Sequence, residues 1–571
     1  MDIRVLISRP RQNQEMIKIK RIIQRMLGKK KAIALPMAII FVLLAGIMAA
    51  GFLQFISSEC HMAEKRKDYI KAFYAAEAGA EKGVYEVKTL YATAYPTDAQ
   101  LLAILAPTIS GYSFSPFTIS RGTSSQGTIT SGLYAGLEGT TATITVSSQA
   151  NSTGPDQAQA KVIQQIQSQY IGVFQFGVFY KNDLEILPGP DMNFAGRVHT
   201  NGNLYAGCNG NLDFDSNVTA KNIYHDRKDD PGNVSNGQVR FIDGDGVKQE
   251  MKQGSVWLDS SQSDWATESQ NRWDGRVKTQ EHGVTDLTLP LPTGYNPHDI
   301  IERGNAGDPA ELANAKYYNK AKKANGGLRI IDGNVINDDG TPDTIATNDL
   351  ITKGVITTKT FYDYREGVNI TVREVDVAAL RTSGKSPANG MLYVSESGTH
   401  KGVRVTNGTE LPSSGLTVAS DNPVYIKGDY NTTNKKKSSV VGDAVYILSS
   451  NWDDTKGDKS LDKRKATPGG TTVNTAIMAG NTETSVGAYN GGLENFPRFL
   501  EDWDGRTLTY SGSLICLWNS EQATGQWYCG GDYYKPPHRH WGYDTMYGDP
   551  AKAPPGAPFI MIIQPTSWSQ L

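Results

Sequence analysis

The amino-acid sequence predicts an α+β protein that is mostly β: a long N-terminal transmembrane helix, a small β head, and then a large β-rich region. Three observations support this prediction. Residues 32–53 form an apolar run without a charge. The residues after this run continue a helical pattern to about Leu90. Beyond the helix, short apolar segments alternate with Asn, Gly, Asp and Ser, which is typical of turn-rich β structure.

The apolar run AIALPMAIIFVLLAGIMAAGFL is long enough to span a membrane. Its 22 residues extend about 33 Å as a helix, and the hydrocarbon core of a bilayer is about 30 Å thick. The leader of residues 1–31 carries ten Lys or Arg against Asp2 and Glu15. The positive-inside rule therefore places the leader in the cytoplasm and the residues after Leu53 on the exported side. A cleaved secretory signal is the alternative, although its apolar part is usually about 7 to 15 residues long.

The continuation of the helix is amphipathic. Apolar or small residues recur at helical spacing at Met62, Tyr69, Phe73, Ala76, Ala80, Val84 and Val87. No turn signal separates this stripe from the apolar run, so we expect one helix over residues 32–90, close to 90 Å long. Pro36 lies near its start, where we expect only a mild kink. Small residues that permit close approach of neighbouring helices follow at Gly46, Ala49, Ala50 and Gly51.

Residues 91–170 are predicted to form a β head on the upper part of this helix. TTATITVSSQAN (residues 140–151) and AQAKVIQQIQSQ (residues 158–169) alternate apolar with polar residues, and the turn-forming segment STGPDQ joins them. We expect a four-stranded antiparallel sheet that covers the helical stripe. A flexible stalk is the alternative, because SRGTSSQGTITSG has low complexity.

The segment AFYAAEAGAEKGVYEV, with the basic leader and the apolar helix, resembles the N-terminus of type IV pilin-like proteins, in particular minor pilins of the PilX type. The resemblance covers residues 28–87. It implies anchoring in a bacterial inner membrane, packing against other pilin or pseudopilin subunits, and processing by a prepilin peptidase near Gly28, Lys31 or Ala32. Three lysines separate Gly28 from the apolar run, and Pro36 stands where major pilins carry a glutamate, which favours a minor subunit over a repeating one.

Residues 171–450 are predicted to form a right-handed β-solenoid, with a β-sandwich as the alternative. Short strands between Asn/Gly turns recur as RVHTNGNLYAG, GVRVTNGTELP, GLTVASDNPVYIKG and SSVVGDAVYILSS, and each reads as one rung that can bury its inward side chains only against the next. We expect a helix inserted at residues 308–326, with Asp308 as its N-cap and Gly326 as its terminator. Residues 451–571 are predicted to be a charged loop followed by an aromatic-rich β region.

Most of the exported region also resembles a bacterial domain of unknown function that is attached to PilX-type N-termini. The resemblance rests on PGPDMNFAGRVHTNGNLY, DNPVYIKGDYN and GGLENFPRFLEDW and spans residues 174–564. It implies a location and an apparatus, and no chemistry.

All four cysteines follow the apolar run and are therefore expected on the exported side. Cys516 and Cys529 lie thirteen residues apart in a region with hairpin character, and disulfides persist outside the cytoplasm. We therefore expect a disulfide between them, which would remove about 3 kcal/mol of denatured-state entropy. Cys60 in the helix and Cys208, distant in sequence, are expected to be free.

The sequence predicts no metal site, no cofactor and no catalytic site. His538 and His540 in PPHRH are better explained by packing or surface exposure than by a metal, and His199 by a structural hydrogen bond. The Asp-rich segments 243–246 and 338–343 lack the spacing of a calcium loop and are better explained as turns. No phosphate-binding, dinucleotide-binding or hydrolase motif occurs. A net charge of -2 provides no positive electrostatic potential that would attract nucleic acid.

Two classes of function remain. The first is a non-enzymatic minor pilin-like component of a type IV pilus or pseudopilus, which displays its exported β region for assembly initiation, tip capping or adhesion to a surface glycan or a neighbouring cell. The second is a membrane-anchored solenoid that binds or acts on polysaccharide, since solenoid grooves can carry paired carboxylates. The sequence shows no such carboxylates grouped by spacing, which favours the first hypothesis.

Overall fold

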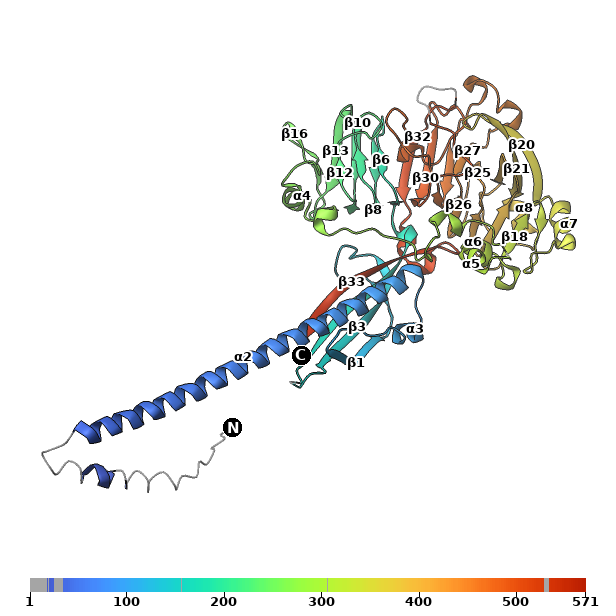
Figure 1. The fold of residues 1–571 in the computed structure, drawn as a ribbon. Helices are drawn as coiled ribbons and strands as arrows, with labels where there is room; N and C mark the ends of the chain where they lie inside the picture. Colours follow the sequence, from blue (N-terminus) through green and yellow to red (C-terminus); the bar gives the residue numbers. More distant parts are fainter. Residues whose placement is uncertain (1–17, 19, 25–33, 156, 306, 528–532) are drawn as a thin grey trace.

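The computed structural model describes residues 18, 20–24, 34–155, 157–305, 307–527 and 533–571. Helix α2 projects from the rest of the molecule, a small β head packs on its inner end, and a large β-rich body lies beyond the head (Figure 1). The long N-terminal apolar helix and the large β-rich region that the sequence predicts are therefore both present.

Helix α2 (Ala34–Thr93) is continuous over 60 residues, which corresponds to about 90 Å. The prediction of one unbroken helix is confirmed for the described residues. The head covers one face of the helix from Ala72 onward, and the predicted stripe extends too far towards the N-terminus, because Met62 and Tyr69 are exposed. The buried residues of α2 are Ala72, Ala75, Ala76, Gly79, Ala80, Gly83, Val84, Val87 and Tyr91.

The head is an antiparallel sheet with the strand order β1-β3-β4-β33, and β2 pairs with β3. Strands β3 (Glu138–Ser152) and β4 (Gln159–Gly172) form the predicted hairpin, so this part of the chain is an ordered sheet and no flexible stalk. Their inward side chains share one buried cluster with the alanines of α2. The smaller elements are α3 (Asp98–Leu102), β1 (Tyr112–Arg121) and β2 (Ser125–Thr128).

The last strand of the chain belongs to the head. β33 (Phe559–Gln570) pairs antiparallel with β4, and Phe559 lies opposite Gly172. The chain therefore leaves the head at Gly172 and returns at Phe559, and the whole body is inserted between two neighbouring strands of one sheet. The sequence analysis did not place this strand in the head.

The main sheet of the body has eleven strands in the order β17-β11-β8-β5-β31-β29-β26-β24-β22-β18-β19, and all neighbours are parallel except β18 and β19. The chain enters at β5 and steps outward through β8 and β11 to β17. It then crosses to the far end at β18 and returns to β31, beside β5. The strands are β5 (Val178–Tyr180), β8 (Val198–Thr200), β11 (Val218–Thr219), β17 (Val277–Lys278), β18 (Leu328–Ile331), β19 (Asn334–Val335), β22 (Met391–Ser395), β24 (Leu416–Ala419), β26 (Ser438–Gly442), β29 (Ala476–Ala479) and β31 (Leu514–Cys516).

Among the described residues, four further sheets of three or more strands have the orders β12-β9-β6, β14-β13-β10-β7, β20-β21-β23-β25-β27 and β28-β30-β32, and most of their pairs are again parallel. A fifth sheet is the antiparallel pair of β15 (Lys252–Gln253) and β16 (Val256–Trp257). We call the strands from β5 to β17 (residues 178–278) the first arm of the body and those from β18 to β32 (residues 328–543) the second arm. In the first arm, Val178, Val198 and Val218 lie side by side in one column, and all three are buried. These strands are β6 (Leu184–Ile186), β7 (Met192–Phe194), β9 (Leu204–Ala206), β10 (Cys208–Phe214), β12 (Ile223–Tyr224), β13 (Asn236–Ile242), β14 (Lys248–Glu250), β20 (Ile356–Asp363), β21 (Val368–Asp376), β23 (Lys401–Thr406), β25 (Val424–Lys427), β27 (Val445–Leu448), β28 (Thr471–Asn474), β30 (Thr507–Gly512) and β32 (His538–Tyr543).

The predicted helix at residues 308–326 is divided. Asp308 is the N-cap as predicted, since its side chain accepts from the backbone N–H of Ala310 and Glu311. The helix breaks at Ala315, and the break lets Tyr317 enter the core, where 1% of it is exposed. The elements are α5 (Pro309–Asn314), α6 (Lys316–Lys320) and the 3-10 turn η4 (Lys323–Asn325), and other short helices of the body are α4 (Trp265–Trp273), α7 (Thr344–Thr352) and α8 (Val377–Thr382).

Candidate functional site

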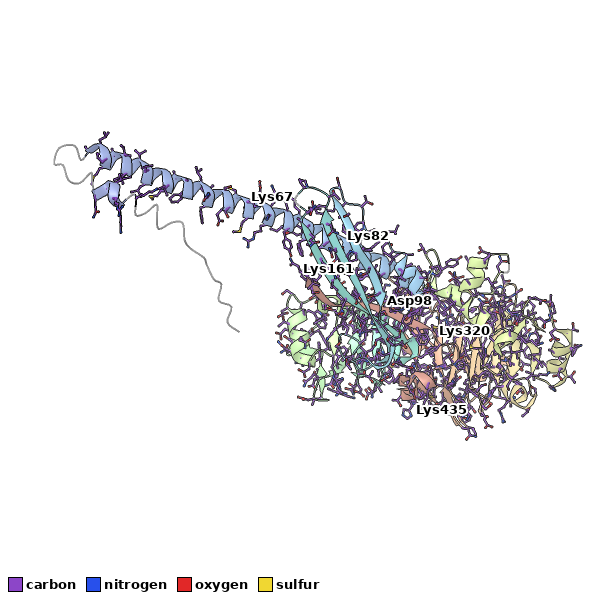
Figure 2. The ribbon with its side chains drawn as sticks, turned by 90° about the horizontal axis from the view of Figure 1, so that it is seen from below. Lys67, Lys82, Asp98, Lys161, Lys320 and Lys435 are labelled. Carbon is purple, nitrogen blue, oxygen red and sulfur yellow. The ribbon has the colours of Figure 1, made fainter. Side chains whose placement is uncertain are left out.

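The outer half of α2 is the most exposed apolar surface of the described structure. Phe41 and Val42 are 76% and 71% exposed, and no described part of the head or body covers them. Among the described residues, α2 is the one helix long and apolar enough to cross a membrane, judged by length and composition. Lys67 lies close to the point where this free segment reaches the head (Figure 2).

The small residues predicted for helix packing all lie on this free segment: Pro36, Gly46, Ala49, Ala50 and Gly51. A Cβ atom added at Gly46 or Gly51 would meet nothing within 4 Å. Gly46 and Ala50 are one turn apart, so they present a shallow strip that another helix can approach closely. Pro36 stands in the first described turn of α2, where a missing N–H is tolerated.

Two other glycines of the same helix have a different role, which the sequence analysis missed. A Cβ atom at Gly79 would lie 2.2 Å from Ser148 Oγ, and one at Gly83 would lie 2.6 Å from Val146 Cγ1. Because these two positions carry no side chain, the backbone of α2 packs directly against side chains of β3. Their spacing of four in AAEAGAEKG was a signal for this contact, since residues four apart share a helix face.

The other predicted processing and disulfide residues are only partly described. Gly28, Lys31, Ala32 and Cys529 lie outside the described residues, so processing and the disulfide stay predictions. Cys516 is buried, and as a thiol it would have its pKa raised by burial to about 12. Cys60 and Cys208 are free, as expected; the first is exposed on α2 and the second is buried.

The histidines named from the sequence are dispersed. His538 and His540 are exposed on β32. His199 is fully buried; its Nδ1 lies 2.7 Å from Thr219 Oγ1 and its Nε2 lies 2.8 Å from Asn201 Oδ1. Burial lowers the pKa of His199 to about 4. The structural interpretation of His199 is therefore confirmed.

A cluster around His298 was not found from the sequence. His298 Nδ1 lies 3.0 Å from Glu302 Oε1 and 3.6 Å from Glu521 Oε1, while Nε2 lies 3.4 Å from Asp443 Oδ1. Burial alone would lower the pKa of His298, but hydrogen bonds to Asp443 and Glu302 raise it to about 10. The segment HDIIE gave a local signal for half of this cluster, whereas Asp443 and Glu521 come from distant parts of the chain.

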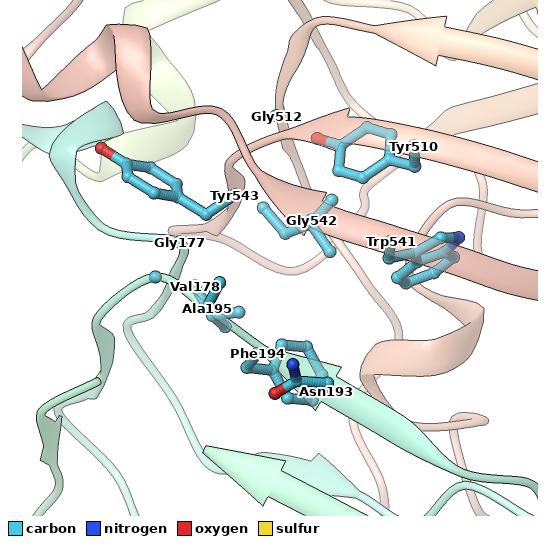
Figure 3. Close-up of a pocket in the computed structure, with 12 residues that line it drawn as sticks. Gly177, Val178, Asn193, Phe194, Ala195, Tyr510, Gly512, Trp541, Gly542 and Tyr543 are labelled. Carbon is cyan, nitrogen blue, oxygen red and sulfur yellow. The ribbon is translucent and has the colours of Figure 1, made fainter. Parts of the chain in front are cut away.

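The point where the two arms of the body meet is closed. Strands β7 and β32 lie beside each other without pairing, and a cavity of about 20 Å³ remains between them (Figure 3). That volume holds about one water molecule. Its lining is mainly apolar or aromatic and includes Val178, Phe194, Tyr510, Trp541 and Tyr543. This seam is therefore a packing contact between the arms.

A wider groove of about 740 Å³ lies beside α7 at the far end of the body. Its lysines are paired with aspartates of the same groove: Lys323 with Asp343, and Lys353 and Lys385 with Asp349. The groove also contains Arg329, so four cationic side chains face two carboxylates and its lining keeps a positive excess.

Two buried carboxyl groups in the body give a test of stability against pH. Glu185 is 3% exposed and accepts from Thr484 Oγ1, and Glu501 is 1% exposed and accepts from Ser449 N and Oγ. Burial raises the pKa of each to about 7. In the unfolded chain both ionise near pH 4.3, so the folded state binds protons more tightly.

We expect the body to lose stability as pH rises from 6.5 to 8.5. A raised folded-state pKa gives stability that is fully present below the unfolded pKa near 4.3, falls as pH rises between the two pKa values, and levels off above the folded pKa near 7. The part lost between pH 6.5 and 8.5 is about 0.8 kcal/mol per group. Thermal unfolding followed by circular dichroism in EDTA measures the slope. Glu185→Gln should flatten it, because the amide does not titrate. An unchanged slope in Glu185→Gln would contradict the assignment.

The chain matches no protein-family model and no curated protein sequence. Among solved structures it is similar to the competence-associated pilin ComZ from Thermus thermophilus, with 12% sequence identity and a TM-score of 0.26. The similarity covers 88% of this chain and 97% of that one.

Proposed function

We propose that this protein is a non-enzymatic, pilin-like component of a type IV pilus or pseudopilus. One observation carries the proposal: a single unbroken helix has an apolar, exposed outer half and an inner half that holds a β head. An exposed apolar rod of this length needs lipid or other apolar helices around it. We call α2 the stem. A pilin-like stem is surrounded by lipid while it is in the bilayer and by the apolar helices of other subunits once it is in a filament.

Small residues on the free segment support packing in such a bundle. Helices surrounded by lipid associate through close van der Waals contact, which small residues at Gly46, Ala49 and Ala50 allow. The basic leader supports an orientation with the N-terminus in the cytoplasm and the body outside the inner membrane. The proposed partners are therefore other pilin or pseudopilin subunits along the stem.

We further propose that the body is a right-handed β-solenoid displayed for assembly initiation, tip capping or adhesion. The parallel column of Val178, Val198 and Val218, with a step of 20 residues, supports stacked rungs. Crossovers between parallel strands of one sheet are right-handed in almost all proteins, which supports the handedness.

The stem contact can be tested with the native Cys60. This residue is exposed and lies fourteen residues after Gly46, close to four helical turns, so both share one face of α2. We expect a bifunctional thiol reagent applied to native membranes to link Cys60 to a second pilin-like subunit. Gly46→Leu and Ala50→Leu should reduce the linked product at least about fivefold, since a bulky side chain on this strip separates helices that pack through small residues.

Met48→Leu is the matched control, because Met48 lies on the opposite face and the exchange conserves volume. It should leave the linked product unchanged, and Cys60→Ser should abolish it. Equal loss in Met48→Leu, or no pilin-like subunit among the linked products, would contradict the proposal. N-terminal sequencing with and without a prepilin peptidase then tests processing at Lys29 or Ala32.

A further inference from the structure

Three distant segments of the body meet at His298. His298 and Glu302 lie on the crossover of residues 279–327, which carries the chain from the end of the first arm to the start of the second. Glu521 follows β31, the strand that closes the main sheet against β5. Asp443 lies in the turn between β26 and β27. A link among these residues therefore fixes the crossover to the closing segment.

We propose that His298 Nδ1 and the carboxylates of Glu302 and Glu521 bind one Zn²⁺ ion. Their three ligand atoms lie within 4.8 Å of one another. The nitrogen is 3.0 Å and 3.6 Å from the two carboxylate oxygens. In a tetrahedral zinc site with bonds of about 2.0 to 2.1 Å, neighbouring ligand atoms are about 3.3 Å apart. The two distances from the nitrogen are therefore within a few tenths of an ångström of this value, and the two glutamate oxygens lie within 4.8 Å of each other.

The contacts on the other side of the His298 ring orient Nδ1 towards the two glutamates. Nε2 faces Asp443 Oδ1 at 3.4 Å, and Asp443 is held by the backbone N–H groups of Glu521, Gln522 and Ala523 at 2.5, 3.1 and 2.9 Å. A carboxylate behind a histidine in this way is the usual second partner of a metal-bound histidine. The Trp518 ring packs edge-on against the imidazole at 5.7 Å between ring centroids and helps to fix it.

The donor set selects the kind of ion. One imidazole nitrogen and two carboxylate oxygens suit Zn²⁺, whereas Ca²⁺ prefers six to eight oxygen ligands. The side chains of Glu302 and Glu521 are 39% and 65% exposed, so an ion can enter from solvent and retain a water as its fourth ligand. Binding would join the crossover and the segment after β31 and leave the seam between the arms closed.

Zinc titration of the full chain tests this site. The protein is purified in detergent, stripped with EDTA and titrated with ZnCl₂ by calorimetry, and bound metal is counted by elemental analysis. We expect one Zn²⁺ per chain that Glu521→Gln and Glu302→Gln lose or bind at least about tenfold more weakly. Zinc should also slow hydrogen exchange in the peptides around residues 298 and 521.

Glu483→Gln is the matched control, because the Glu483 side chain is also 65% exposed and lies in a different contact, with Lys228. It should bind zinc like the unmodified chain. If both glutamine variants at the site also bind zinc unchanged, the ion sits elsewhere and the proposal fails. It fails too if the chain binds no Zn²⁺, which would leave the cluster as an ion pair of a protonated His298, or if Ca²⁺ binds more tightly.

Discussion

Removal of residues 559–571 unfolds the head and leaves the parallel sheets of the body folded. The lost strand β33 contributes Ile560 and Ile562, which are 0% and 6% exposed in a cluster between the head and the main sheet, and Met561 and Ile563, which are partly buried against the helix cluster. Each large apolar side chain that is fully buried contributes about 1.5 to 3 kcal/mol. Ile560 and Ile562 alone therefore contribute about 3 to 6 kcal/mol, and the partly buried Met561 and Ile563 add to this, which is comparable to the lower end of the stability of a small domain, about 5 to 15 kcal/mol.

Hydrogen exchange separates the two parts of the truncated chain. Amides of β3 and β4 should exchange at unfolded rates, because β4 loses its partner on one side and the cover of its core. Amides of β24, β26 and β29 should stay protected. Removal of Ser569, Gln570 and Leu571 alone is the control, since all three are exposed and should have little effect. Protected β3 and β4 in the longer truncation would show that β33 is dispensable.

The sequence predicted those parts of the fold whose signals are local. Helix α2 follows from an apolar run and a stripe without a turn between them, and the β3–β4 hairpin follows from alternation on either side of STGPDQ. Strand β33 could not be placed, because its partner β4 is almost 400 residues away and no local pattern records the pairing. Pro565 also argues against a strand, and the structure accommodates it with a register shift between Pro565 and Ser567.

The order of strands in the body was hidden for the same reason. The strands were visible as short apolar runs between turns, but the pairing of β5 with β31 joins residues more than 300 apart. A chain that enters its sheet in the middle has the same local pattern as one that enters at an end. The predicted helix at 308–326 failed at Ala315, where burial of Tyr317 outweighs the helix propensity of the segment.

The candidate sites divide in the same way. The exposed small residues around Gly46 were predicted from composition alone, because no described part of the chain covers them. The His298 cluster needed the fold: Glu302 is one helical turn away, but Asp443 and Glu521 reach the imidazole only after the crossover and the closing strand are in place. A histidine with a glutamate four residues later is by itself too common a pair to identify a site.

Gly83→Leu separates the stem from the head and costs about 3 kcal/mol of head stability. A Cβ atom at this position would already lie 2.6 Å from Val146 Cγ1, and Val146 is fully buried in the middle of β3 with a stiff, β-branched side chain. Overpacking of this kind forces side chains and backbone to shift, typically at about 1 to 3 kcal/mol for a few added carbons. Leucine adds four, so the helix must move away from the sheet.

Gly51→Leu makes the same chemical change on the same helix, where a Cβ atom would meet nothing within 4 Å. Thermal unfolding with hydrogen exchange of β3 and β4 should show a lower melting temperature and faster exchange for Gly83→Leu, and unmodified behaviour for Gly51→Leu. Equal stability of the two variants would mean that the head does not rest on Gly83. Since the stem holds the head through this contact, the Gly83 variant also removes the rigid link between the exposed apolar rod and the body.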